Sequence, residues 1–251
     1  FLGPLSNPKT TQALADAGAT AFAMEAIPRI SRAQSMDALS SQSNVAGYKS
    51  VLVATNHLGR FLPMMMTAAG TITPAKVLVL GAGVAGLQAI ATAKRLGAKV
   101  SANDVRAASA DEVASMGGTF IHLDLDAADA SGGYAKELGQ DRAKLQRELL
   151  TPHVHEADVI ITTAAIPGRP APRLITAPML KGMRAGSVIV DLAAETGGNV
   201  EGSVAGTDTE VKVADGTITL VGMKDAASTM PYDASRLYAK NVANLIALIT
   251  H

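Results

Sequence analysis

Three glycines followed by one carboxylate are the residues of this chain best suited to hold a ligand. Gly81, Gly83 and Gly86 form a G-x-G-x-x-G pattern. In such a pattern the first glycine permits a tight turn, the second lets the main chain approach a pyrophosphate, and the third lets the next helix pack closely on a strand. That helix would also direct free N–H groups and the positive end of its dipole toward the phosphates. Asp104 follows at a position where a carboxylate can accept hydrogen bonds from a ribose.

The residues around this pattern supply the structural context that it requires. Residues 77–80 form a short, continuous apolar run, as expected of a central parallel strand covered on both faces. Because a helix and a second strand ending in an acid follow, the segment 76–106 favours a dinucleotide fingerprint over a turn that serves only helix packing. A 2′-phosphate beside Asp104 would suffer like-charge repulsion, which favours NAD(H) over NADP(H). The cation Arg106 weakens this preference without reversing it.

The order of the expected elements predicts an α/β fold with a doubly wound parallel sheet, of the Rossmann type. After the fingerprint, helical stretches separate four further expected strands, near 119–123, 158–163, 187–192 and 218–222.

Upstream of the fingerprint we expect one long helix after several shorter elements. Spacings of three and four give this helix a buried side made of Val45, Tyr48, Leu52, Thr55 and Leu58. The earlier elements are a helix at 8–17, a strand at 21–26 and a loop or short helix at 29–44.

These elements predict two domains. Residues 1–44 read as the C-terminal part of a first α/β domain, and 45–230 as the Rossmann NAD(H)-binding domain. Residues 231–251 read as a helix that returns to the first domain, amphipathic over 235–249. The chain opens on Phe1 rather than Met, so we expect the N-terminal portion of the first domain to be missing from it.

The composition excludes several classes of protein. The 251 residues are 48% apolar and 18% charged, with a formal net charge of zero. Zero net charge argues against nucleic acid or an anionic membrane as the main partner. The chain has no cysteine, which excludes disulfides and thiol chemistry. It also lacks a run of about 18 apolar residues that could cross a bilayer.

Other segments are less specific. The proline-rich loop 164–172 follows an expected strand, so it either forms a wall of the ligand cleft or is only a rigid turn. Asp191 and Glu195 are weak candidates for general bases, because carboxylates in loops are usually solvated. We expect Met64 to Met66 to fill the core at a helix end. His153 and His155 read as a surface pair rather than a zinc site, since no third ligand is in register.

Eight segments in order resemble one family. They are RISRAQSMDALSSQSNVAGY at 29–48, PMMMTAAGT at 63–71, GVAGLQAIATAKRLGA, NDVRAA, GGYAKE, TTAAIPGRPAP, DLAAETGGN and the AKN of the closing helix. Together they resemble the NAD(H)-binding subunit of the proton-translocating NAD(P) transhydrogenases, over essentially the whole chain.

This resemblance implies roles for four residues around the nicotinamide. Asp37 and Ser40 would bond its carboxamide, and Gln34 would bridge the bound NAD(H) and an incoming nucleotide. Arg29 would bond the ribose or pyrophosphate region. Without the resemblance, helix capping and surface solvation would account for the same residues.

The resemblance also implies which residues hold the rest of the dinucleotide. A loop closes over NAD(H) with Tyr134, next to Gly133, and the ribose group is formed by Asp104, Val105 and Arg106. The remaining contacts come from Val84 in the glycine turn and from Thr163 and Ala164 at the end of a strand.

The activity implied by the family is direct hydride transfer from NADH to NADP⁺, without an acid–base residue. The NADP(H) would sit on a partner domain or subunit, and a proton-channel membrane subunit would couple the transfer to proton translocation. The resemblance further implies a homodimer, in the cytoplasm and peripheral to the inner membrane. Two alternatives remain: alanine dehydrogenase, which shares the fold and fingerprint, and an NAD-sensing module without turnover.

Overall fold

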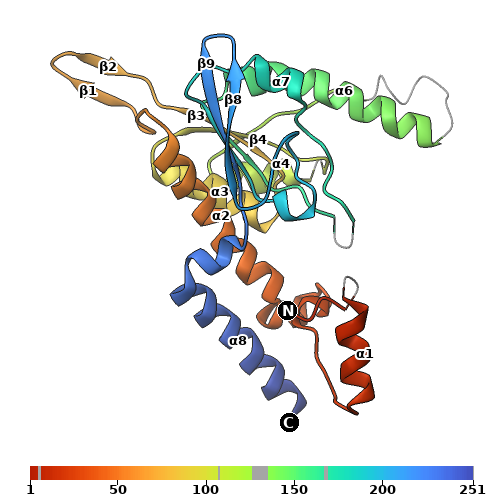
Figure 1. The fold of residues 1–251 in the computed structure, drawn as a ribbon. Coiled ribbons are helices and arrows are strands. Elements are labelled where there is room, and N and C mark those ends of the chain that lie inside the picture. Colours follow the sequence, from red (N-terminus) through yellow and green to blue (C-terminus); the bar gives the residue numbers. More distant parts are fainter. Residues whose placement is uncertain (5–6, 107, 126–134, 167–168, 251) are drawn as a thin grey trace.

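The computed structural model describes residues 1–4, 7–106, 108–125, 135–166 and 169–250, and of 135–140 it describes only the backbone. Figure 1 shows an α/β body built around one sheet, and a smaller helical lobe that holds both ends of the chain. The long helix α2 (Ala38–His57) runs from this lobe into the body. In the lobe are α1 (Pro8–Asp16), the 3₁₀ helices η1 (Met24–Ala26) and η2 (Ser31–Met36), and the closing helix α8 (Pro231–Ile249).

The main sheet has seven strands in the order β5-β4-β3-β6-β7-β9-β8. All neighbours are parallel except β8 and β9, which are antiparallel. Without β8 this is the strand order of a dinucleotide-binding fold, with its reversal point between β3 and β6. The strands are β3 (Lys76–Leu80), β4 (Lys99–Asn103), β5 (Thr119–Phe120), β6 (Val159–Thr162), β7 (Val188–Asp191), β8 (Thr207–Val213) and β9 (Gly216–Gly222). The predicted doubly wound parallel sheet is confirmed.

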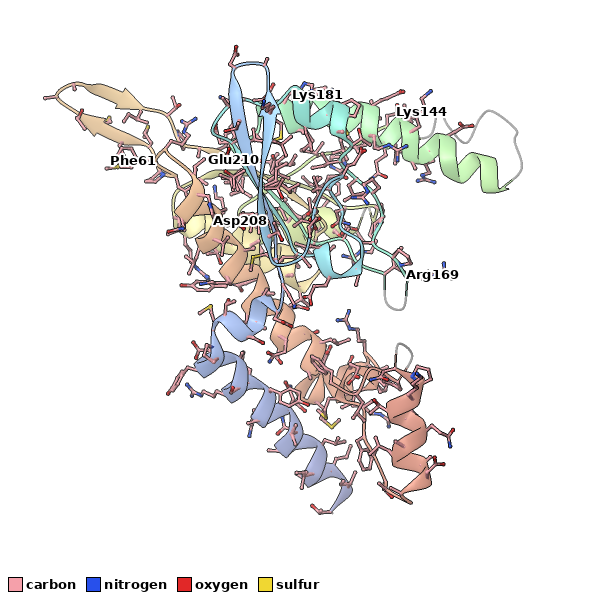
Figure 2. All side chains as sticks on the ribbon, viewed as in Figure 1. Phe61, Lys144, Arg169, Lys181, Asp208 and Glu210 are labelled. Carbon is pink, nitrogen blue, oxygen red and sulfur yellow. The ribbon has the colours of Figure 1, made fainter. Side chains whose placement is uncertain are left out.

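The antiparallel edge strand β8 was not predicted. Its charged side chains Asp208 and Glu210 are exposed, and Figure 2 shows both along this strand. An alternation of charged and apolar residues lacks the continuous apolar run of the central strands. Charges on an outer strand also discourage further strands from pairing with it.

The alternation of side chains along β3 divides the core into two layers. Val77 and Val79 pack in one apolar cluster and Leu78 and Leu80 in the other. The first cluster includes side chains from α2, from α3 (Val84–Arg95) and from α4 (Ser109–Ser115); the second includes side chains from α6 (Ala135–Glu156) and α7 (Ala177–Lys181). A strand covered on both faces explains the continuous apolar run in the sequence.

The buried side of α2 agrees only in part with the predicted one. Val45 and Leu58 are buried as predicted, but Tyr48 is exposed, and Gly47, Val51 and Ala54 are buried as well. A Cβ on Gly47 would lie 2.1 Å from the carbonyl oxygen of Ala85 in α3, so the two helices touch through main-chain atoms. The prediction was wrong at Tyr48 because close helix packing selected small residues, which an apolar periodicity undervalues. The helix also begins at Ala38, earlier than the predicted 45.

In the helical lobe the expected strand at 21–26 is absent. Met24–Ala26 form a 3₁₀ turn instead, since no strand among the described residues of this lobe offers it backbone partners. The predicted helices near 8–17 and 235–249 are present, and α8 packs along η2 and α2.

A two-stranded hairpin leaves the body after α2. It consists of β1 (Met65–Thr67) and β2 (Gly70–Ile72), and Figure 1 shows it projecting away from the sheet. Met64, Met65 and Met66 are exposed here, so the expectation that they fill the core was wrong. Phe61, at the base of the hairpin in Figure 2, is also exposed. Within the described residues, no helix combines the length and apolar character needed to cross a membrane.

Candidate nucleotide site

A cavity of about 420 Å³ opens at the carboxyl ends of β3 and β6, where the strand order reverses. Its volume is within the usual range of small-molecule sites. Eight residues singled out in the sequence line it: Arg29, Gly81, Gly83, Asp104, Val105, Arg106, Thr163 and Ala164. The further lining residues include Gln146 and Leu150 of α6, and Pro172 and Leu174 of the loop after β6.

The three glycines of the turn are required for different reasons. Gly81 has a φ of +104°, and a Cβ there would lie 2.5 Å from Thr163 Oγ1. A Cβ on Gly86 would lie 1.8 Å from the carbonyl oxygen of Gly81. Gly83 has an ordinary φ of −76°, and a Cβ there would meet no described atom within 4 Å. The fold itself thus explains Gly81 and Gly86, whereas the open space at Gly83 is available to a ligand.

The first turn of α3 begins at this glycine turn. Gly83 is the N-cap, and no side chain of the described residues caps the helix. Val84, the first helical residue, is exposed and does not line the cavity. Free N–H groups at a helix N-terminus favour an anion such as a pyrophosphate.

Asp104 ties the end of β4 to the glycine turn. Its Oδ2 accepts a hydrogen bond of 2.7 Å from the Ala82 N–H, and its Oδ1 accepts from the main chain and Nε of Arg106. The Arg106 guanidinium also donates to the Ala82 carbonyl. Burial raises the pKa of Asp104, but these hydrogen bonds outweigh burial and hold the pKa below its ordinary value. Asp104 is therefore a carboxylate at neutral pH, with lone pairs left for ribose hydroxyls.

The loop after β6 is held by residues that sequence reasoning did not assign to the site. Asn199 is fully buried; its Oδ1 accepts from the Ala164 N–H, and its Nδ2 donates to the carbonyls of Ala164 and Pro172. These bonds join the two ends of the loop that lines the cavity. The DLAAETGGN segment was a signal in the sequence, but Asn199 itself was not singled out.

The surroundings of Asp191 in the same segment favour a structural role over that of a general base. It is fully buried, and it accepts hydrogen bonds from Thr162, Ala193, Asn199 and Val200. The expectation that this carboxylate is solvated was wrong, because four donors replace water around it. Glu195 is exposed and accepts from the Asp225 N–H.

The polar segment before α2 approaches the cavity through Arg29. Its Nε lies 3.7 Å from Asp37 Oδ2, and Arg29 lines the cavity. Asp37 is the N-cap of α2 and accepts from the N–H and the hydroxyl of Ser40, at 2.9 and 2.6 Å. Gln34 is exposed on η2. Gln34, Asp37 and Ser40 do not line the cavity, and Gly133 and Tyr134 lie outside the described residues.

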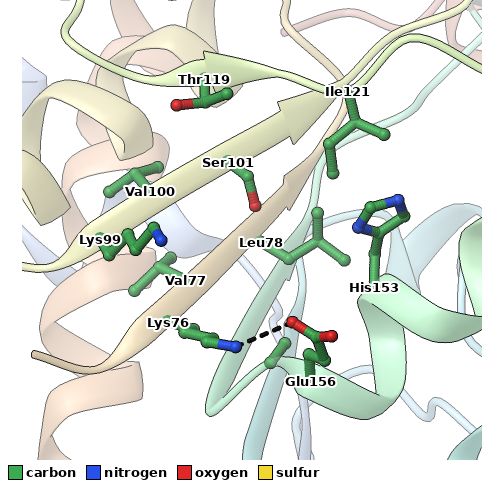
Figure 3. A pocket seen from close by; sticks show the side chains of 11 residues that line it. Lys76, Val77, Leu78, Lys99, Val100, Ser101, Thr119, Ile121, His153 and Glu156 are labelled. Carbon is green, nitrogen blue, oxygen red and sulfur yellow. Dashed lines mark hydrogen bonds and ion pairs between the residues drawn. The ribbon is translucent and has the colours of Figure 1, made fainter. Parts of the chain in front are cut away.

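A second cavity of about 220 Å³ lies at the amino ends of β3, β4 and β5 (Figure 3). Lys76 and Glu156 face each other there at 2.8 Å, and this hydrogen bond lowers the pKa of Glu156. His153 of α6 also lines it. Ligands of open parallel sheets bind beyond the carboxyl ends of the strands, so the first cavity is the better candidate for a nucleotide. No cluster of three metal-binding side chains occurs among the described residues.

Comparison with known proteins agrees with this geometry. The family model "Alanine dehydrogenase/PNT, C-terminal domain" matches residues 50–251, and the corresponding N-terminal domain model matches residues 1–46. An NAD(P) transhydrogenase alpha subunit of Rhodospirillum rubrum is 53% identical over 98% of this chain. The chain spans 64% of the length of that relative.

A solved structure and a second relative define the similarity further. The crystal structure of transhydrogenase from Sinorhizobium meliloti superposes with a TM-score of 0.85 at 50% identity, covering 98% of this chain and 66% of that one. The alanine dehydrogenase of Bacillus subtilis is 31% identical, over 80% of this chain and 48% of its own length. This chain therefore belongs to the alanine dehydrogenase/PNT family.

Proposed function

We propose that the chain is the NAD(H)-binding component of an NAD(P) transhydrogenase, in which hydride passes directly between NADH and NADP⁺ held on a partner domain. One observation carries most of this proposal: Arg29, from the polar segment before α2, lines the same cavity as Gly83 and Asp104. An arginine from the smaller lobe thus reaches the nucleotide cavity of the sheet. The similarity to transhydrogenase alpha subunits supports the same function.

The residues of the cavity fit a dinucleotide. Gly83 leaves space for the pyrophosphate, the uncapped start of α3 offers N–H groups to it, and the Asp104 carboxylate can accept from the adenosine ribose. Val105, Thr163 and Ala164 complete the walls. The negative charge of Asp104 disfavours a 2′-phosphate, so the site fits NAD(H) better than NADP(H).

The polar segment would act on the reacting end. NAD(H), when bound, supplies or receives the hydride at its nicotinamide. Asp37 and Ser40 would orient the carboxamide, Arg29 would hold the ribose or pyrophosphate region, and Gln34, exposed on η2, would face the second nucleotide. Orientation of two reactants can contribute roughly 7–11 kcal/mol of barrier lowering, so the mechanism requires no acid–base residue.

The transfer requires partners outside this chain. These are an NADP(H)-binding domain or subunit and a proton-channel membrane subunit, which would place the chain in the cytoplasm, peripheral to the inner membrane. Residues 1–44 and 231–251 would form one domain beside the nucleotide fold at 45–230; the hydrogen bonds between α8 and the polar segment support this division.

We also infer a homodimer from the hairpin. The hairpin and the residue before it present an exposed apolar surface, made of Met64, Met65, Met66 and Ile72, which suits contact with a second copy of the chain. We expect the Met66→Glu substitution to weaken the dimer in analytical sedimentation. A variant as dimeric as the wild type would show that the hairpin does not form the dimer interface.

Mixing the chain with a transhydrogenase NADP(H)-binding partner tests the proposed function. We expect NADH to reduce an NADP⁺ analogue in the mixture, and neither component to do so alone. Oxidation of alanine by NAD⁺ without the partner would instead identify an alanine dehydrogenase. Tight NADH binding without either reaction would leave only a sensing role.

A further inference from the structure

Two asparagines of the closing helix α8 hold one carbonyl group of the polar segment. Asn241 Nδ2 and Asn244 Nδ2 both donate to the main-chain oxygen of Ser35, each at 2.9 Å. About 200 residues separate Ser35 from these asparagines along the chain. Ser35 directly follows Gln34 and lies two residues before Asp37.

The side chain of Asn241 is fixed on both sides. Its residue is only 7% exposed, and its Oδ1 accepts a hydrogen bond of 2.7 Å from the Ser41 hydroxyl. A carbonyl oxygen can only accept, so the amide must turn its Nδ2 toward Ser35 and its Oδ1 toward Ser41. Asn241 therefore joins η2 to the first turn of α2, on either side of Asp37.

The segment that Asn241 holds has little support of its own. η2 is a 3₁₀ helix of six residues, and no side chain among the described residues caps its start. Runs of 3₁₀ helix longer than three or four residues are uncommon, because their hydrogen bonds have poor geometry. Contacts from outside must then decide the conformation of η2. Ala33 and Met36 are buried by packing, and the two asparagines of α8 hold the main chain at Ser35.

We propose that Asn241, assisted by Asn244, is a positioning residue for the nicotinamide end of the site. By fixing Ser35 it holds Gln34 and Asp37 in place, while the glycine turn and Asp104 at the adenosine end are held by other contacts. The effect on hydride transfer rests on the proposed function; the effect on the conformation of η2 does not.

The Asn241→Asp variant tests this role at nearly constant volume. The substitution replaces the donating Nδ2 by an oxygen that faces the Ser35 carbonyl, so η2 loses the more buried of its two donors from α8 and gains a repulsive contact. Asn56→Asp, the same chemical change on an exposed position of α2, is the matched control. ADP-ribose, which has the adenosine and pyrophosphate but no nicotinamide, probes the rest of the site.

We expect Asn241→Asp to slow hydride transfer to the partner's NADP⁺ analogue by tenfold or more, while the Kd for ADP-ribose changes less than twofold. Trypsin should cut after the exposed Arg29 and Arg32 at least threefold faster than in the wild type. Asn244→Ala, on a less buried position, should show the same pattern at smaller size. If Asn241→Asp does not fold, the same measurements on Asn244→Ala test the proposal.

Three outcomes would overturn the proposal. One is unchanged hydride transfer and unchanged cleavage. Another is a parallel loss of ADP-ribose affinity and thermal stability, which would indicate a general structural role. The third is an equal effect of Asn56→Asp. If the wild type transfers no hydride, the proposed function fails, and the trypsin cleavage rates still decide whether Asn241 positions η2.

Discussion

The carboxylate of Asp104, at the end of β4, accepts a hydrogen bond of 2.7 Å from the main-chain N–H of Ala82 in the glycine turn after β3. One side chain therefore holds the glycine turn in place and, in the proposed function, would also present negative charge to the ribose. Because both tasks fall on the same group, changing only its charge separates cofactor choice from the geometry of the turn.

Asp104→Asn should reduce the preference for NADH over NADPH. The amide oxygen can still accept from Ala82, but the charge that repels a 2′-phosphate is lost, and Arg106 remains nearby. We expect the ratio of the two Kd values to fall at least about tenfold, a change of about 1.4 kcal/mol. Fluorescence titration measures both constants, with Asp111→Asn on the exposed side of α4 as the control. An unchanged ratio would contradict the role of Asp104.

Gly83→Ala and Gly86→Ala should separate binding from stability. At Gly83 an extra methyl group meets no described atom, so the free energy of unfolding should change by less than about 1 kcal/mol. The same methyl group would occupy the space for the pyrophosphate, and NADH affinity should fall at least tenfold. Gly86→Ala places a Cβ against the Gly81 carbonyl and should cost about 1–3 kcal/mol or more. Urea unfolding measures the stability of both variants, and NADH titration measures their affinity. Wild-type NADH affinity in Gly83→Ala would contradict the proposal that the pyrophosphate lies against Gly83.

Asn199→Ala should loosen the loop after β6. The change leaves the Ala164 N–H and the carbonyls of Ala164 and Pro172 without their partner. Each buried group left without a hydrogen bond costs about 1–3 kcal/mol, so we expect a loss of stability of at least that size. NADH affinity should fall as well, because this loop lines the cavity. Asn56→Ala, at an exposed position of α2, is the control for denaturation and titration.

Gln34→Asn should affect transfer more than binding. Gln34 is exposed on η2 and does not line the cavity, so NADH affinity should remain within twofold of the wild type. The shorter side chain cannot reach the second nucleotide in the same way, and hydride transfer to the partner should slow about tenfold, about 1.4 kcal/mol of barrier. Stopped-flow measurement with the partner checks this, with Gln12→Asn on exposed α1 as control. Wild-type transfer rates in Gln34→Asn would exclude the bridging role.

The pH dependence of Asp104 follows from the direction of its pKa shift. Since its pKa in the folded chain lies below the ordinary value of 3.8, its contribution to stability is present above that value and is lost as pH falls through the lower one. The stability difference between wild type and Asp104→Asn should therefore be constant from about pH 8 to 5 and shrink only below about pH 4. A difference that already declines near pH 6 would show that the carboxylate is not held ionised.

The central strands and the glycine turn could be predicted because their signals are local. The apolar run at 77–80 and the spacing of Gly81, Gly83 and Gly86 each depend on a few adjacent residues. Met64 to Met66 were wrongly predicted to lie in the core, since three consecutive apolar residues occur both in a core and on an exposed hairpin.

The residues that support the site were harder to predict because their partners are distant in sequence. Asn199 is hydrogen-bonded to Ala164, and Asn241 to Ser35. Neither pair can be recognised in the sequence from spacing or hydropathy. Asp37 and Ser40 are close in sequence, but their function was still hard to predict. Their hydrogen bonds are those of an ordinary helix cap, so local geometry alone does not distinguish structure from function.

The main-chain contact between Gly47 and Ala85 fixes α2 against α3, so the length of α2 sets the distance from this contact to Asp37. Ten helical positions separate Gly47 from the cap at Asp37, a rise of about 15 Å. Inserting or deleting one residue between them would move Asp37 by about 1.5 Å along the axis and turn it by about 100° around it. In the proposed function, a change in the length of this interval would turn the residues assigned to the nicotinamide away from the bound cofactor.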